Sequence, residues 1–393
     1  MRLFFTLVWL CALSVLAAEP KAAGGDYIAD IEQRIIDLEQ RQKDMREWYE
    51  NFYILGKGRV TPFLGNALSI GGFFESAVTH LYGPDIKTQT SGNIHTLGLN
   101  IAAQFNEKTK FVTQTWTRLV IPLANTNPNL TPPQSGFEEY RFFSIVVQGY
   151  LEYRVSDFFI VQSGLGYTPY GIVAQQREPQ LFRLRGGSQT IAYDDGDTIG
   201  IFSPLWTGLH FLGILPINHN LGYNLYTFTP LNQVSTLGIG ARLWYKLSDK
   251  ATVGTSVQSG EQRKGSFFSH GFDVDLKYKD YGFVSEYGHT TNSGDVPDAE
   301  FYYFEPYVKF AEDRWLFFLN AEYIDTLERT DFATHIPDPV KKWQHGGGFN
   351  WLPISNARLR LTYLYHDYID EADMISGQER DYNTIDFSTA VAF

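Results

Sequence analysis

Apolar and polar residues alternate along most of the chain, from about Ala67 to Phe393. The pattern is clear between Thr96 and Phe105, where one parity is occupied by Leu97, Leu99, Ile101, Ala103 and Phe105. Successive side chains of a β-strand point to opposite faces of the sheet. The period of two therefore predicts strands with one apolar face and one polar face.

Sixteen such segments can be counted. They start near Ala67, Gly92, Thr109, Glu139, Phe158, Pro204, Asn220, Ser235, Ala251, Phe268, Tyr281, Phe301, Arg314, Trp343, Ala357 and Tyr382. Short connections fall at 106–108, 156–157, 216–219, 248–250, 279–280, 311–313 and 355–356. Between them lie mostly longer ones, at 80–91, 122–138, 168–203, 230–234, 259–267, 290–300, 326–342 and 370–381. An even strand number with short turns at one end and long loops at the other predicts an all-β, 16-stranded antiparallel transmembrane β-barrel.

A water-soluble β-sandwich is the alternative, because its strands alternate too, with the apolar face turned inward. Aromatic residues near the strand ends favour the barrel, since membrane barrels carry aromatic girdles at both interfaces. On the apolar parity these are Phe105, Tyr153, Tyr245, Tyr278, Phe310 and Trp315. Barrels of about 16 to 18 strands leave an aqueous channel, so the polar parity is expected to line a water-filled passage for small solutes.

The polar parity supplies candidates for the channel lining. Basic candidates are Lys110, Arg118, Arg154, Arg242, Lys246, Lys277, Arg358 and Arg360. Acidic candidates are Glu75, Glu152, Asp273, Asp275, Glu286, Glu305, Glu322 and Asp386. The two sets are equal in number, so the charge of the lining predicts neither anion nor cation selectivity. Each residue is also compatible with a water-facing position that has no part in selectivity.

A helical pattern precedes the alternating region. Ile28, Ile31, Ile35, Leu38, Gln42, Met45 and Tyr49 follow one another at spacings of 3 and 4. This is a heptad seam, and Ile at both a and d positions favours more than two helices. The segment predicts a short coiled coil that joins subunits, three in the simplest case. One amphipathic helix packed on a core is the alternative, and a linker containing Gly58 and Pro62 ends the pattern.

The amino-terminal residues predict export. Met1 and Arg2 precede the apolar stretch 3–16, and small residues follow, so a signal peptide cleaved after about Ala17 or Ala18 is expected. The only cysteine, Cys11, lies inside this segment. The mature chain would contain no thiol for a disulfide, a metal or a nucleophile. The expected organisation is a signal peptide (1–18), a periplasmic coiled-coil segment with its linker (19–60) and a barrel (61–393).

Composition excludes other classes. The 393 residues are 16% aromatic and 19% charged, with a net charge of −12. So many aromatics argue against a disordered chain, and the acidic balance argues against nucleic-acid binding. After residue 18 there is no run of about 18 apolar residues, so a helical membrane protein is not expected. The mean hydropathy of −0.22 is consistent with an average over one apolar and one polar face.

The end of the chain carries a specific resemblance. Ile385, Phe387, Thr389, Val391 and Phe393 alternate up to the last residue, and this resembles the final strand of Gram-negative outer-membrane proteins. In that group the terminal Phe is recognised by the barrel-assembly machinery, which gives Phe393 the expected role of an assembly signal. The mature chain resembles the 16-stranded trimeric porins. Its heptad segment looks like the coiled coil of substrate-selective phosphate or dicarboxylate porins, and the layout is similar to barrel porins proposed for siderophore uptake.

This resemblance implies a homotrimer in the bacterial outer membrane, with membrane lipid, lipopolysaccharide and small hydrophilic solutes as partners and no cofactor. In such porins the third outer loop folds into the barrel and narrows it. The corresponding loop, about 168–203, is the longest here. Its constriction candidates are Arg177, Arg183, Arg185, Asp194, Asp195 and Asp197. A transverse field from these two sets would select on charge. A solvated surface loop is the alternative.

The sequence offers little for an enzyme. The nine His are scattered without His-x-x-x-His or His-Glu-x-x-His spacing, and no Gly-x-Ser-x-Gly occurs. No catalytic or metal-binding residue is therefore expected. A surface hydrolase using His335 and Asp338, or a divalent cation at Asp194, Asp195 and Asp197, is a weaker reading. The favoured function is a diffusion porin. The alternatives are a substrate-selective uptake porin for a siderophore or organic anion, and a non-conducting adhesin or structural barrel.

Overall fold

The chain divides by its contacts into two units, Met1–Glu50 and Asn51–Phe393, and every described residue belongs to the second. The computed structural model describes residues 61–63, 68–83, 89–121, 141–156, 158–172, 205–215, 220–229, 237–262, 265–293, 298–330, 337–354, 356–368 and 381–393. The expected signal peptide and heptad segment lie outside these residues. Within them, the structure contains no helix with the length and apolar character needed to cross a membrane.

The described residues form seventeen strands. These are β1 (Thr61–Phe63), β2 (Leu68–Tyr82), β3 (Gln89–Asn106), β4 (Thr109–Ile121), β5 (Arg141–Ser156), β6 (Phe159–Tyr167), β7 (Leu205–Ile214), β8 (Leu221–Phe228), β9 (Gly238–Ser248), β10 (Ala251–Gln262), β11 (Gly265–Tyr278), β12 (Tyr281–Asn292), β13 (Ala299–Phe310), β14 (Trp315–Thr330), β15 (Pro337–Ile354), β16 (Ala357–Tyr368) and β17 (Tyr382–Ala392). The expected starts lie within a few residues of these bounds. The largest difference is at β15, expected near Trp343 and found at Pro337.

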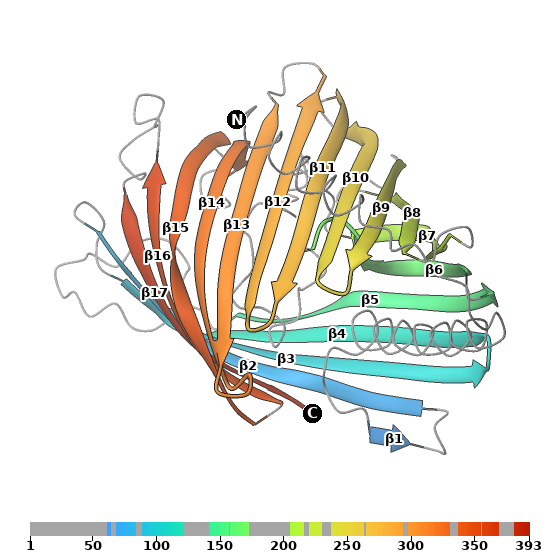
Figure 1. The fold of residues 1–393 in the computed structure, drawn as a ribbon, viewed down its shortest axis with the longest axis horizontal. Coiled ribbons are helices and arrows are strands. Elements are labelled where there is room, and N and C mark those ends of the chain that lie inside the picture. The colour runs from blue at the N-terminus through green and yellow to red at the C-terminus, as the bar shows by residue number, and fades with distance from the viewer. Residues whose placement is uncertain are drawn as a thin grey trace, which may run out of the picture. The chain divides into compact units, whose positions relative to one another are not determined.

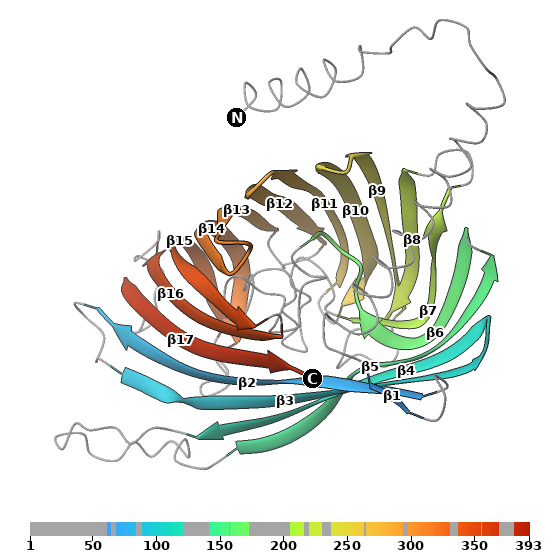
Figure 2. The same cartoon turned by 60° about the horizontal axis from the view of Figure 1, so that its bottom comes forward.

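The strands close into an antiparallel barrel. Each strand from β2 to β16 pairs with the next one along the chain, and β17 pairs with β2, so sixteen strands complete the circle (Figures 1 and 2). The short strand β1 pairs with the start of β2, with Thr61 opposite Ile70. The predicted 16-stranded antiparallel barrel is confirmed. The additional strand β1 was not anticipated, because three residues are too few to show an alternation.

Two connections differ from expectation. The prediction of a long loop at 259–267 is wrong, because β10 continues to Gln262, which pairs with Gly265 of β11. Ser and Gly residues weaken the alternation in this stretch, whereas backbone pairing needs no particular side chain. Most of 326–342 is likewise strand, with a register shift between Thr326 and Arg329.

The tight turns are confirmed where they are described. Residues 279–280 join β11 to β12, and residues 311–314 join β13 to β14. These turns hold the four non-glycine residues with positive φ among the described ones: Lys279, Ala311, Glu312 and Asp313.

The wall buries its polar parity and exposes its apolar parity. On β17, Asp386 and Ser388 are buried, while Ile385 and Phe387 are exposed. In a closed barrel the buried face is the inner one, so the polar residues line the interior together with a set of aromatic ones, while the outward face is largely apolar. This arrangement contradicts the β-sandwich alternative. Phe105 and Tyr278, two of the expected girdle residues, are 65% and 60% exposed at strand ends.

Aromatic residues on the inner face lie across glycines of the neighbouring strand. Eight pairs face each other in register: Phe73–Gly98, Trp206–Gly166, Trp244–Gly222, Phe228–Gly238, Tyr226–Gly240, Tyr307–Gly282, Phe301–Gly288 and Phe318–Gly348. A methyl group at each of these glycines would meet the facing ring, at 2.9 Å from Trp206 Nε1 for Gly166 and 3.0 Å from Phe318 Cζ for Gly348. The rings therefore occupy the space that a side chain on the opposite strand would otherwise fill.

Candidate functional site: the lumen of the barrel

A row of polar side chains crosses five adjacent strands, β4 to β8, on the inner face. Lys110 Nζ lies 3.0 Å from Glu152 Oε1, and Gln162 donates to Glu152 Oε2 at 2.8 Å. His210 continues the row, with Nδ1 at 2.8 Å from Gln162 Oε1 and Nε2 at 3.0 Å from Asn224 Oδ1. Because each side chain holds the next, the row gives the inner wall a rigid polar surface.

Two buried ion pairs extend this polar surface, and each reaches over an intervening strand. Arg242 on β9 contacts Asp273 on β11 at 2.7 Å. The strand between them places Gly254 opposite Asp273, and a side chain at Gly254 would overlap the carboxylate. The missing side chain on β10 therefore leaves room for the ion pair. Removing one partner of such a buried pair is costly, because the other charge is left uncompensated.

The second pair lies at the seam that closes the barrel. Arg360 on β16 pairs with Glu75 on β2 across β17, and its Nε donates to Ser388 Oγ at 2.9 Å. Next to this pair, Thr79 Oγ1 donates to Asp386 Oδ1. Side-chain contacts thus reinforce the backbone pairing between the last and first strands of the circle.

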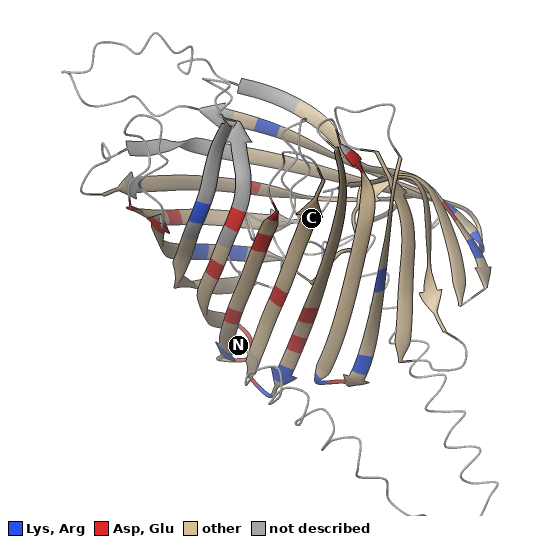
Figure 3. Cartoon of the chain, turned by 90° about the horizontal axis from the view of Figure 1, so that it is seen from above, with Lys and Arg blue, Asp and Glu red and all other residues tan. Residues whose placement is uncertain are grey.

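Acidic side chains gather on four consecutive strands. Asp273, Glu286, Glu305 and Glu322 stand on β11, β12, β13 and β14, and all four are buried on the inner face. Asp273 is directly opposite Glu286. Tyr303 donates to Glu305 Oε2 at 2.6 Å. Figure 3 shows that acidic and basic residues lie along the strands as well as at their ends.

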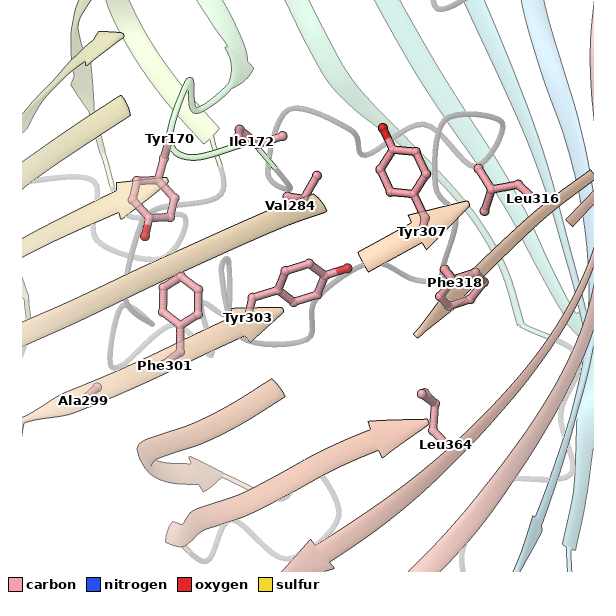
Figure 4. Packing of buried hydrophobic residues seen from close by; sticks show 10 residues of the cluster. All are labelled: Tyr170, Ile172, Val284, Ala299, Phe301, Tyr303, Tyr307, Leu316, Phe318 and Leu364. Atoms are coloured by element: carbon pink, nitrogen blue, oxygen red, sulfur yellow. The ribbon is translucent and has the colours of Figure 1, made fainter. Parts of the chain in front are cut away.

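The chain that leaves β6 crosses to the far wall. Tyr170 and Ile172 belong to one buried cluster with Val284, Phe301 and other residues of β12–β16, and Figure 4 shows them facing this wall. Since β6 and β12 are six positions apart in a circle of sixteen strands, the segment passes through the lumen. Burial raises the pKa of the Tyr170 phenol above its usual value, and the nearby carboxylate of Glu286 raises it further.

The structure places the described lining candidates on the inner parity. Lys110, Glu152, Arg242, Asp273, Glu286, Glu322 and Arg360 take part in the contacts above or stand beside them. Half-buried positions on the same parity are occupied by Arg118, Arg154, Asp275 and Arg358. Asp275 contacts Lys277 at 2.7 Å, and Arg118 Nε lies 3.4 Å from Thr96 Oγ1. The candidates of the third outer loop and the heptad residues lie outside the described part of the chain.

Several inner-face residues were missed. Gln162, His210 and Asn224 sit on the same parity as the charged candidates, but a search restricted to charges passes over neutral polar residues. Lys309 also lies on the inner parity of β13, where it contacts Asp313 at 3.2 Å. The sequence pattern did not indicate that Tyr170 is buried against the far wall, because this position depends on contacts with strands far along the chain. Among the described residues, no group of His, Cys, Asp and Glu is arranged to hold a metal ion.

Comparison with known proteins supports the fold. No protein-family model and no curated protein sequence matches the chain. OmpF of Salmonella typhi, solved with daunomycin, matches with a TM-score of 0.57 at 12% identity, over 85% of this chain and 100% of that one. An anion-selective porin from Comamonas acidovorans matches at 0.55 and 11%, over 83% and 99%. OmpT, an outer-membrane protein of Vibrio cholerae, matches at 0.53 and 10%, over 85% and 100%. The chain has the barrel fold of outer-membrane porins.

Proposed function

We propose that the protein is an outer-membrane porin, a water-filled channel for the passive diffusion of small hydrophilic solutes. The observation that carries this proposal is the closed circle of sixteen strands with its polar residues inside. Barrels of about this strand number enclose an aqueous channel, while smaller ones fill their interior with side chains. An exposed apolar outer face with aromatic residues at the strand ends supports a membrane location.

Weak selectivity is the expectation for this lining. The three ion pairs Lys110–Glu152, Arg242–Asp273 and Arg360–Glu75 each place both signs of charge next to one another. Paired charges contribute little net field at a distance. We therefore expect weak selectivity between anions and cations rather than a strict filter.

The finer parts of the proposal concern segments outside the described residues and one described residue, Phe393. Residues 1–18 act as a signal peptide. The heptad segment between Asp26 and Tyr49 forms a periplasmic coiled coil that helps to hold a homotrimer. OmpT of Vibrio cholerae, folded in vitro, has been solved in a trimer form, which is consistent with this assembly. Arg177, Arg183, Arg185, Asp194, Asp195 and Asp197 act at the constriction, lipopolysaccharide surrounds the barrel, and Phe393 acts as the assembly signal.

Single-channel recording tests the function directly. The chain from residue 19 onward is refolded in detergent, its folded state is verified by heat-modifiable migration, and it is added to a planar bilayer. A diffusion porin gives ohmic conductance in steps that group in threes. A correctly folded and inserted barrel that carries no current would contradict the proposal. A substrate-selective uptake porin would show the same steps, with block by low concentrations of one organic anion or siderophore.

A further inference from the structure

We propose that Tyr170 is the positioning residue of the channel, holding the chain that leaves β6 against the far wall of the lumen. Its phenol group packs against two glycines, Gly271 of β11 and Gly288 of β12, which together form what we call the seat of Tyr170. The inference rests on the proposed porin function for its consequence, but the seat itself is a feature of the fold. It concerns residues 168–172, all of which are buried.

The seat exists because two glycines face each other. Gly271 and Gly288 are directly opposite in register on the inner face. A methyl group added at Gly288 would lie 2.7 Å from the Tyr170 hydroxyl, and one at Gly271 would lie 2.5 Å from the hydroxyl and 2.9 Å from Tyr170 Cε2. The Tyr170 side chain is 1% exposed. Any larger residue at either position would therefore displace this ring.

Neighbouring contacts hold the backbone next to the ring. The Tyr170 hydroxyl donates to the backbone oxygen of Tyr287 at 3.3 Å, and the Ile172 N–H donates to Glu286 Oε1. Gly171 lies between them with φ of +53°, a conformation that favours glycine. A side chain at Gly171 would also overlap the Glu286 carboxylate. Three consecutive residues are thus fitted to β11 and β12.

A third strand, β13, also contacts Tyr170. The ring of Phe301 on β13 meets the Tyr170 ring edge to face, with centroids 6.4 Å apart and planes at 70°. Phe301 itself lies over Gly288. Aromatic pairs of this geometry stabilise packing beyond the area that they bury. The seated ring therefore anchors the crossing segment, and the position of that segment sets the passage left between it and the β6 side of the wall.

The first test measures whether Tyr170 protects its neighbour. Ile172→Cys is introduced into the chain from residue 19 onward, which contains no other cysteine. Ile172 is 7% exposed, so a charged methanethiosulfonate reagent should label the thiol slowly. Adding Tyr170→Ala should raise the labelling rate about tenfold, because local opening becomes easier. Tyr170→Phe should keep the rate low, since the ring is the main anchor and the hydroxyl contact is long.

Tyr150→Ala is the matched control, because Tyr150 is a buried inner-face tyrosine of β5 outside this cluster. It should leave the labelling of Cys at position 172 unchanged. Equal labelling with and without Tyr170→Ala would overturn the inference. If Tyr170→Ala does not fold, Tyr170→Leu replaces it. Leucine keeps apolar bulk but cannot fill the seat, so it too should raise the rate.

Conductance then connects the seat to the channel. Tyr170→Ala should give single-channel steps with a wider spread and more frequent current fluctuations than the unsubstituted chain, while Tyr170→Phe should not. If Tyr170→Ala raises the labelling rate at position 172 but the barrel carries no current, the porin function is contradicted and the proposed role of Tyr170 is not. If the barrel conducts but Tyr170→Ala changes neither the conductance steps nor the labelling rate, the proposed role of Tyr170 is contradicted and the porin function is not.

Discussion

Phe393 and Gly72 close the barrel by exchanging two backbone hydrogen bonds, each 2.9 Å long. The Phe393 ring lies over Gly72, where an added methyl group would be 2.8 Å from its Cζ. Just beyond this point, β1 takes over as the partner of β2, with Thr61 opposite Ile70. One edge of β2 is therefore paired along its length by two segments, β17 and then β1, which come from opposite ends of the barrel sequence.

Phe393→Ala should weaken this seam by about 1 kcal/mol, the usual scale for a lost packing contact. The folded fraction after refolding is measured from heat-modifiable migration, and stability from urea unfolding. Phe387→Ala changes an exposed outward aromatic residue of β17, the strand that ends just before Phe393, and serves as the control; it should cost less. If both substitutions had equal effects, the contact of Phe393 with Gly72 would have no special part in closure.

Gly240→Ala should destabilise the barrel by about 1 to 3 kcal/mol, because the methyl group overlaps the Tyr226 ring and forces it to move. Unfolding in urea measures the change. Gly149→Ala is a matched control, since its methyl group would only touch Val146 at 3.5 Å. The double variant Gly240→Ala with Tyr226→Ala should cost less than the sum of the single changes, as the overlap is gone. Additive costs would mean that the ring and the glycine do not interact.

Arg242→Met should cost about 3 to 5 kcal/mol, because Asp273 remains buried without its partner at 2.7 Å. The double variant Arg242→Met with Asp273→Leu should recover much of this loss, since neither charge is then buried alone. Urea unfolding in detergent gives both values. A double variant as unstable as the sum of its parts would show that Arg242 and Asp273 act independently.

Glu305→Gln together with Glu322→Gln should shift the channel toward anions by about twofold in permeability ratio, equivalent to about 0.4 kcal/mol. Both carboxylates are on the inner face, where they favour cations in the passage. Reversal potentials in a salt gradient measure the ratio. Asp325→Asn, which removes a charge from the outward parity of the same strand β14, should leave it unchanged. An equal shift in that variant would place the effect at the membrane surface.

Deletion of residues 26–49 should reduce the trimer fraction while leaving the barrel able to fold and insert, because the heptad seam and the barrel are separate segments. The trimer is measured by native migration and by cross-linking, and insertion by channel activity. An unchanged trimer fraction would show that the barrel wall alone holds the subunits together. Replacing Gln42 by Ile in the intact chain tests whether a polar a position sets the register.

Much of the barrel could be predicted because a strand's two faces follow from local geometry alone. The parity of Glu152 or Arg360 is set by the alternation around it, and so is its place on the inner or outer face. The strand count followed from the same period. Predictions failed where side chains gave no alternation, as at Gln262 and Gly265, because the backbone continued to pair without it.

The sequence by itself thus determined the sixteen strands of the circle, though not β1 or every strand end, and the face on which most of their residues lie, since these depend on neighbours two positions away. Only the tertiary structure decided which inner-face groups meet. Arg242 reaches Asp273 because Gly254 lies between them on β10, and Tyr170 reaches Gly271 and Gly288 because closing the barrel brings β6 opposite β12. Such contacts join residues far apart in the chain, and their partners are chosen by the register and curvature of the closed sheet, which no local pattern records.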